Sequence, residues 1–173
     1  MKLLNIICIS VVTLILSGCI SPYSSVKRSP GYADMKFPSF LKTDTRMRLN
    51  LGPMSMKPLR WAMANSEEGD LEIIDDVEAI RLRLYDANKG RDYLLKAIDN
   101  SRAQLLEDGW NTIVSITDTE DRVVVMTAEE DGIIQGVSIM LISDSEAVFA
   151  NLVGDLEPEK VAKLISKMHE KNS

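Results

Sequence analysis

The second half of the chain contains short segments in which apolar and polar residues alternate. Alternation with a period of two is typical of half-buried strands, and it predicts strands over roughly residues 111–117, 122–128, 133–142 and 147–153. The turns between these segments are only a few residues long. Because such short connections join only antiparallel neighbours, the sequence predicts a four-stranded antiparallel meander.

Two more alternating segments lie upstream of the meander. Residues Met47 to Leu51 predict a short strand that ends at Gly52-Pro53, and residues 80–85 predict a second, half-buried strand. The start of this second strand is left open as far back as Leu71, because residues 71–78 also fit a helix.

Three segments carry apolar residues at helical spacing. Residues 90–108 predict a central helix that Gly109 ends. Pro58 suits the first turn of an earlier helix, and Pro158 suits the start of a last one. The inner stripes of these two helices are Leu59, Ala62 and Met63, and Val161, Leu164, Ile165 and Met168. Because such stripes need a sheet to cover, the predicted fold class is α+β: a two-layer sandwich of a mostly antiparallel sheet with the helices on one face.

The N-terminal residues follow a different pattern. Lys2 precedes an apolar run over residues 3–16, which is shorter than the about 20 apolar residues that a bilayer-spanning helix needs. We therefore expect residues 1–18 to be a cleaved signal peptide.

The end of this leader, Leu16-Ser17-Gly18-Cys19, resembles the lipobox of bacterial lipoproteins. The resemblance implies cleavage between Gly18 and Cys19, a diacylglyceryl thioether on Cys19, and acylation of the new amine by a fatty acid such as palmitate. Ile20 stands where an aspartate would favour retention in the inner membrane, so the resemblance implies the outer membrane of a Gram-negative bacterium. An ordinary signal peptide with a chance cysteine is the alternative.

The region after Cys19 predicts a tether. Residues 19–45 are rich in Ser, Pro and Gly, carry more basic than acidic residues and lack apolar periodicity. The basic residues either lie near lipid headgroups or only keep the tether soluble. Residues 46–170 then form the single α+β domain.

Composition limits the chemistry. The chain has two cysteines, of which Cys8 is lost with the leader and Cys19 is capped by lipid, so we expect no disulfide, thiol nucleophile or thiolate metal site. The formal net charge of −6 disfavours nucleic acid as a partner. The only histidine, His169, lacks the partners that a catalytic triad or a histidine metal site needs.

Two residue classes leave metal binding open as an alternative. The acidic clusters lie at residues 67–70, 75–76, 118–121 and 129–132. None of them has the spacing of an EF-hand loop. Weak calcium binding is an alternative only for the cluster at residues 118–121. Five methionines surround Trp61 in the sequence: Met35, Met47, Met54, Met56 and Met63. They fill the core, line a pliable partner groove or bind cuprous copper. Of these interpretations we favour the core, and we expect no metal, cofactor or catalytic residue.

Several segments together resemble one uncharacterised family of bacterial lipoproteins, a domain of unknown function of the 4252 type. They are the lipobox leader, the strand at residues 80–84, the region of Trp110, and Leu152-Val153-Gly154-Asp155-Leu156 before a short helix. The family has no established catalytic residues, so the resemblance transfers none.

We therefore expect a lipid-anchored outer-membrane lipoprotein that faces the periplasm. It would be a non-enzymatic interaction or accessory module of the cell envelope with an unidentified protein partner. The second face of the sheet or the Met/Trp segment is the candidate contact surface. The alternatives are a hydrolase that acts on envelope glycans or lipids through carboxylates, and a carrier of small ligands.

Overall fold

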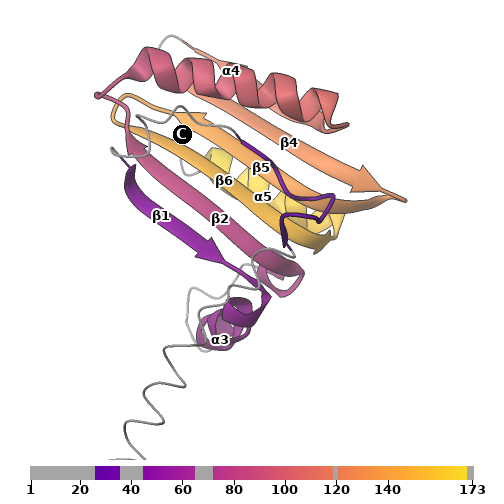
Figure 1. Cartoon of the computed structure of the whole chain (residues 1–173). Helices are drawn as coiled ribbons and strands as arrows, with labels where there is room; N and C mark the ends of the chain where they lie inside the picture. The colour runs from indigo at the N-terminus through magenta and orange to yellow at the C-terminus, as the bar shows by residue number, and fades with distance from the viewer. Residues whose placement is uncertain (1–25, 36–44, 65–71, 119–120, 171–173) are drawn as a thin grey trace, which may run out of the picture.

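The protein is built on one six-stranded antiparallel sheet. The computed structural model describes residues 26–35, 45–64, 72–118 and 121–170. The strands run in the order β1-β2-β6-β5-β4-β3, as Figure 1 shows. Their bounds are β1 Thr45–Leu51, β2 Val77–Asp86, β3 Asn111–Thr117, β4 Arg122–Glu130, β5 Ile133–Ile142 and β6 Glu146–Leu156. The predicted meander is confirmed as β3 to β6, and β2 and β1 extend the sheet from the side of β6.

The helices lie on both faces of the sheet, so the prediction that they share one face is wrong. The helical elements are α3 Pro53–Ala64, the 3-10 helix η2 Glu72–Asp75, α4 Arg91–Glu107 and α5 Pro158–Glu170. Helix α4 covers one face, and α5 lies behind the other (Figure 1). Among the described residues, no helix has both the length and the apolar character that a membrane crossing needs.

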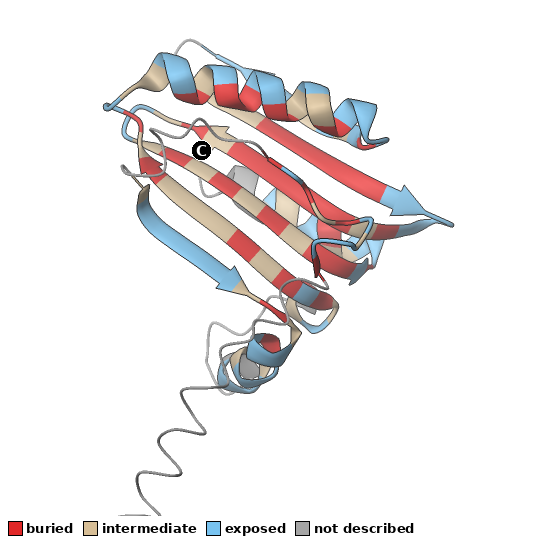
Figure 2. Cartoon of the chain, viewed as in Figure 1, coloured by how far each residue is buried: buried red, intermediate tan, exposed pale blue. Residues whose placement is uncertain are grey.

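Both faces are apolar because neighbouring residues of the central strands are buried on opposite sides. Val124 and Met126 of β4 pack in the cluster that contains α4, whereas Val125 packs in the cluster that contains Val161 of α5. We call these two sides the α4 face and the α5 face. Figure 2 shows that buried residues dominate the middle of the sheet. The fold is α+β as predicted, but a central sheet separates two helical layers.

The core on the α4 face is centred on an aromatic pair. Tyr85 and Phe149 are both buried and meet edge to face, with ring centroids 5.8 Å apart and planes at 85°. Edge-to-face pairs stabilise a core beyond the area that they bury. The inner residues of α4 are Leu94, Ala97, Ile98, Ser101 and Leu105, which match the predicted stripe of the central helix.

Helix α3 begins earlier than predicted. The backbone amides of Ser55 and Met56 donate to the carbonyl of Gly52 at 2.9 and 3.1 Å, so the helix starts at Pro53 and Pro58 lies inside it. Proline is well suited to the first helical position because its missing N–H would have no partner there. The inward residues also shift: Met56 is fully buried, while Ala62 is exposed.

The last strand continues beyond the predicted end at Val153. Gly154 lies opposite Val77 in the register of β2 and β6, and β6 continues to Leu156. A methyl group at Gly154 would overlap the carbonyl oxygen of Asp76. This glycine therefore permits close approach of the backbone and does not end the strand.

Residues 26–35, which fall within the tether predicted over residues 19–45, pack against the domain. They lie across the α4 face, with Val26, Ala33 and Met35 buried (indigo in Figure 1). Residues 19–25 and 36–44 lie outside the described part of the chain. We call residues 26–35 the strap.

Candidate functional site

The strap is held by one buried side chain of the central sheet. Asn151 of β6 is fully buried. Its Oδ1 accepts from the backbone amide of Ala33 at 3.0 Å, and its Nδ2 donates to the carbonyls of Gly31 and Val137 at 3.0 and 3.2 Å. Because a buried amide without partners is costly, this set of hydrogen bonds fixes the position of the strap on the sheet.

A neighbouring arginine forms a second attachment. Arg81 of β2 lies opposite Asn151 in the register. Its Nη1 donates to the hydroxyl of Tyr32 at 2.9 Å and to the carbonyl of Ala33 at 3.3 Å. Its guanidinium lies 5.5 Å from the centroid of the Tyr32 ring, which is within range for a cation–π contact.

Two glycines allow the strap to approach the sheet. A methyl group at Gly31 would overlap the carbonyl oxygen of Gln135, and one at Gly136 of β5 would overlap the carbonyl oxygen of Gly31. Backbone therefore packs directly on backbone here, which only glycine permits. The strap is a built part of the domain, and we call Val26, the first residue that the structure describes, its entry point.

The residues predicted for lipidation and cleavage, Cys19 and Gly18, lie outside the described residues. Val26 follows Cys19 by seven residues. Seven residues span at most about 25 Å when fully extended. A lipid on Cys19 would therefore hold the entry point of the domain within this distance of a membrane.

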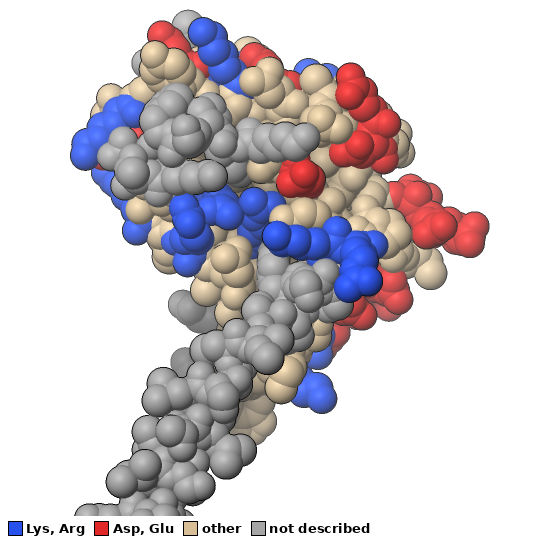
Figure 3. All heavy atoms as spheres, in the orientation of Figure 1, with Lys and Arg blue, Asp and Glu red and all other residues tan. Residues whose placement is uncertain are grey.

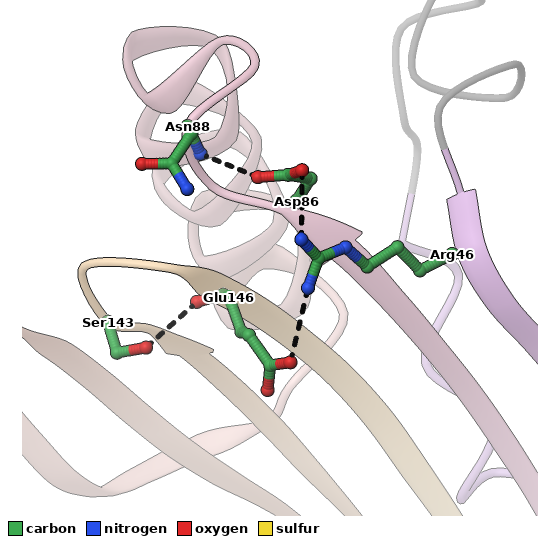
Figure 4. A network of polar contacts seen from close by, with 5 residues as sticks. All are labelled: Arg46, Asp86, Asn88, Ser143 and Glu146. Carbon is green, nitrogen blue, oxygen red and sulfur yellow. Dashed lines mark hydrogen bonds and ion pairs between the residues drawn. The ribbon is translucent and has the colours of Figure 1, made fainter.

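The first surface feature is a polar network at the end of the sheet where β2 ends. The guanidinium of Arg46 forms ion pairs with Asp86 at 2.9 Å and with Glu146 at 3.4 Å (Figure 4). The backbone amide of Asn88 donates to the other oxygen of Asp86 at 3.1 Å. Burial alone would raise the pKa of Asp86, but the bonds from Asn88 and Arg46 outweigh it and lower this pKa below its usual range.

The second feature is a basic strip on the α4 face. Arg48 of β1 pairs in register with Arg83 of β2, and Arg81 lies two residues further along. Burial, followed by the charges of Arg81 and Arg48, lowers the pKa of Arg83. Figure 3 shows basic side chains gathered over β1, β2 and the strap, and acidic ones at the tip of β4 and β5. Basic residues thus lie toward the β1 edge of this face, and acidic residues lie toward β4 and β5.

The third feature is a row of apolar side chains across the α5 face. Its members are register neighbours on successive strands, and none of them is buried: Met47, Leu84, Val148, Leu141, Val123 and Ile116. The two ends are the most exposed, at 45% for Met47 and 44% for Ile116. We call this set the apolar row. The four residues between them are partly exposed, and an apolar surface that continues across a sheet in this way is typical of a protein contact.

The fourth feature is the outer stripe of α3. Met54 and Trp61 are each 74% exposed. They are seven residues apart, with Lys57 and Pro58 between them, so the four side chains share one side of the helix. Helix α3 contains no acidic residue.

The methionines of the predicted Met/Trp segment do not form one site. Met35 is buried on the α4 face, where the hydroxyl of Ser138 donates to its sulfur at 3.7 Å. Met56 is buried in the other cluster, on the α5 face. The core interpretation is confirmed for these two. A copper site that includes both is wrong, because the sheet separates them. The side chain of Met63 lies outside the described residues.

The acidic clusters that the structure describes occupy turns and ion pairs. Asp131 and Gly132 form the two-residue turn between β4 and β5, with φ of 54° and 80°, as a type I′ hairpin turn requires. Asp76 is paired with Lys160 at 2.7 Å, which raises the pKa of Lys160. In the part of the chain that the structure describes, no three acidic, histidine or cysteine side chains gather where they could hold a metal ion.

Some predicted positions fall outside what the structure describes. They are the acidic residues 67–70, two residues of the cluster at 118–121, and the side chain of His169. For the 118–121 cluster, the structure shows that the amide of Asp118 donates to the carbonyl of Asp121 at 2.8 Å.

The sequence interpretation missed the attachment of the strap. The sequence contains two signals. Asn151 is a polar residue inside the apolar segment 147–153, and Arg81 is a charged residue that alternates with apolar residues in β2. A polar residue inside a buried strand needs a partner, but the sequence does not say that the partner lies more than a hundred residues away.

The fold and these surfaces define a small α+β domain with a packed N-terminal strap and an apolar row on the opposite face. The chain belongs to the family described as "Domain of unknown function (DUF4252)", whose model matches residues 42–164. The match begins after the strap. No protein with a curated description matches the chain.

Proposed function

We propose that this protein is a lipid-anchored outer-membrane lipoprotein whose domain faces the periplasm. It acts there as a non-enzymatic interaction module of the cell envelope. The anchor rests on the lipobox sequence at residues 16–19. The interaction role rests on one structural observation, the apolar row that crosses all six strands without being buried.

The strap supports a tethered arrangement. It joins the entry point of the chain to the central strands through Asn151 and Arg81. A pull on the anchor would therefore act on the middle of the sheet rather than on a peripheral strand. Two or three acyl chains on Cys19 would hold the protein on a bilayer stably, whereas one chain would bind only marginally.

The apolar row supports an envelope protein as the partner. Its exposed ends, Met47 and Ile116, lie on the two edge strands β1 and β3. The α4 face is different, because α4 and the strap cover its centre. We therefore expect the partner to bind on the α5 face, with its contact centred on the apolar row.

The anchor is tested by acylation and membrane retention. Cells that express the full chain are fed a fatty acid bearing an alkyne, and the purified protein is examined by mass spectrometry. The parent should carry diacylglycerol and acyl chains on Cys19 as its first residue. Cys19→Ser should remain an unprocessed, unlabelled precursor. A serine variant that is processed and retained like the parent would show that the anchor is not at this residue.

The contact surface is tested by photocrosslinking in intact cells. A photoreactive amino acid at Met47 should crosslink to a discrete envelope protein. The matched control places it at Lys96, which is exposed on α4. Crosslinks at Lys96 but not at Met47 would move the contact surface to the other side of the sheet.

A further inference from the structure

The outer stripe of α3 has the chemistry of a segment that lies in a membrane interface. Trp61 and Met54 present large apolar surfaces, each 74% exposed, and Lys57 lies between them. Tryptophan is enriched where bilayer meets water, and amphipathic helices bind there through apolar residues flanked by basic ones.

The position of α3 fits this role. The guanidinium of Arg60 on α3 donates to the carbonyls of Ile74 and Val77 at 3.1 and 2.8 Å, which fixes the helix at the start of β2. Val26 packs beside Ala79, two residues further along the same strand. The helix and the entry point of the chain therefore lie at one end of the sheet, as Figure 1 also shows.

The length of chain before Val26 limits where the membrane can be. A lipid on Cys19 cannot lie more than about 25 Å from Val26. The end of the sheet that carries α3 is therefore the part of the domain that a bilayer reaches first. The apolar row lies far from this end of the sheet, since Leu84 follows Val77 by seven residues, which is about 23 Å along the strand.

Charged side chains of both signs lie at this end of the sheet. Lys57 of α3 and the strap residues Lys27 and Arg28 are exposed at this end. Acidic residues also lie at this end: Asp75, Asp76 and Glu78 at the start of β2, and Asp155, Glu157 and Glu159 where β6 passes into α5. Asp76 and Glu157 are paired with Lys160 at 2.7 and 3.5 Å. The acidic turn at residues 129–131 lies at the same end of the strands, because Ile134 pairs with Leu156 and Gly154 pairs with Val77, but it joins β4 to β5 and is separated from β2 by β6. On the side with β1, β2 and α3, the basic residues Lys57, Lys27 and Arg28 are placed to contact anionic headgroups when the stripe inserts.

We propose that α3 is a membrane-contacting helix, which inserts Trp61 and Met54 into the headgroup region of the bilayer that holds the lipid anchor. This inference rests on the proposed lipoprotein function, and it adds that the domain has a fixed orientation. The end that carries α3 faces the lipid, and the apolar row is held away from it, accessible to a partner.

Trp61 itself provides the measurement, because the chain has only one other tryptophan, Trp110, which is buried. The full chain with Trp110→Phe is expressed in bacteria, purified, and placed in vesicles of phosphatidylethanolamine and phosphatidylglycerol. Brominated acyl chains should lower the fluorescence of Trp61 by about twofold, and its emission should shift to the blue. The matched control, Trp61→Phe, reports from Trp110 and should show neither effect.

A second variant tests the stripe without changing the probe. Met54 is so exposed that Met54→Asp should leave the fold intact, yet a carboxylate in the headgroup region should reduce the quenching of Trp61 by brominated lipid. Lys57→Gln is milder and should reduce it less. Equal quenching in the parent and in Met54→Asp would contradict insertion of the stripe.

The outcomes separate this inference from the proposed anchor. If Cys19 is acylated but Trp61 stays open to iodide and insensitive to brominated lipid, the anchor stands and the role of α3 is overturned. If Cys19 carries no lipid, the proposed function fails. The inference is then decided by the same quenching on the unlipidated protein mixed with vesicles, where quenching supports it and its absence overturns it.

Discussion

Buried polar side chains decide how the N-terminal part of this protein is placed. Asn151 satisfies one strap amide and one strap carbonyl, and a second carbonyl within the sheet. Arg81 adds a bond to the strap carbonyl of Ala33. An apolar residue in place of Asn151 would remove its hydrogen bonds, and each buried backbone group left without a partner costs about 1–3 kcal/mol.

We therefore predict that Asn151→Ala lowers the free energy of unfolding by roughly 3 kcal/mol. Urea denaturation followed by circular dichroism measures the change. The control is Asn100→Ala, at an exposed position of α4, which should change it by less than about 0.5 kcal/mol. Equal effects of the two substitutions would show that the Asn151 hydrogen bonds contribute little.

The ionisation of Asp86 makes the free energy of unfolding depend on pH. Its pKa is lower in the folded protein than in the unfolded chain, because Asn88 and Arg46 bind the ionised carboxylate more than burial penalises it. The stabilisation from this group is therefore complete above the unfolded pKa, which is about 4, and is lost as the pH falls through the lower folded value.

Asp86→Asn should accordingly lower the urea midpoint at pH 7 and have a smaller effect near pH 3. Midpoints measured across this range test the expectation. Asp144→Asn, in the exposed turn between β5 and β6, removes the same charge without an ion pair and should leave the pH 7 midpoint nearly unchanged. A loss for Asp86→Asn that is as large at pH 3 as at pH 7 would contradict the linkage.

Among the elements, the strands and the central helix were predictable from the sequence, but the two-sided sheet was not. The alternation in β3 to β6 marks each strand, because one side chain in two is inward on any sheet. The alternation does not show whether helices cover one face of the sheet or both. The residues of β5 illustrate this, since Val137 and Ile139 are buried under the α5 face while Ser138 and Met140 are buried under the other.

The strap was the element that sequence patterns missed. Of its three buried apolar residues, Ala33 and Met35 are two apart as in a strand, but Val26 lies seven residues earlier, so the three form no run that marks an element. Its other contacts are backbone groups bound to Asn151 and backbone packing at Gly31 and Gly136. Such contacts depend on residues far away in the chain, so no local pattern predicts them. For the same reason, the sequence placed Met35 and Met56 in one cluster although the sheet separates them.

A single methyl group should displace the strap. Gly31→Ala would force the added carbon into the carbonyl of Gln135, so the hydrogen bond from the amide of Ala33 to Asn151 should weaken. Hydrogen exchange measured by mass spectrometry should show faster exchange in residues 26–35 and little change in α4. Pro30→Ala is the control, because Pro30 is adjacent but exposed. Unchanged exchange in Gly31→Ala would mean that the strap tolerates the added carbon.

The surface features of the domain lie at opposite ends of its strands. Helix α3, η2, the start of α5 and the entry of the strap lie at one end of the sheet (Figure 1). The network of Arg46, Asp86 and Glu146 lies at the other end, close to Leu84 and Val148 of the apolar row. A membrane at the first end and a protein partner near the second would not compete, which is what an anchored interaction module needs.

The strap should also contribute to the stability of the entire domain, although the family match begins only at residue 42. A chain that begins at residue 42 loses the buried side chains of Val26, Ala33 and Met35 and leaves Asn151 without its strap partners. Burial of Val26 and Met35 contributes roughly 4 kcal/mol. The shorter chain should therefore unfold at lower urea and should bind a dye specific for exposed apolar surface.

The matched comparison is a chain that begins at residue 26, which keeps the strap and lacks the anchor. Because both chains lack Cys19, any difference in their urea midpoints reports on residues 26–41, which contain the strap. We expect the chain from residue 42 to be clearly less stable than the chain from residue 26. Equal midpoints would show that the family-matched region is a complete folding unit and that the strap only rests on its surface.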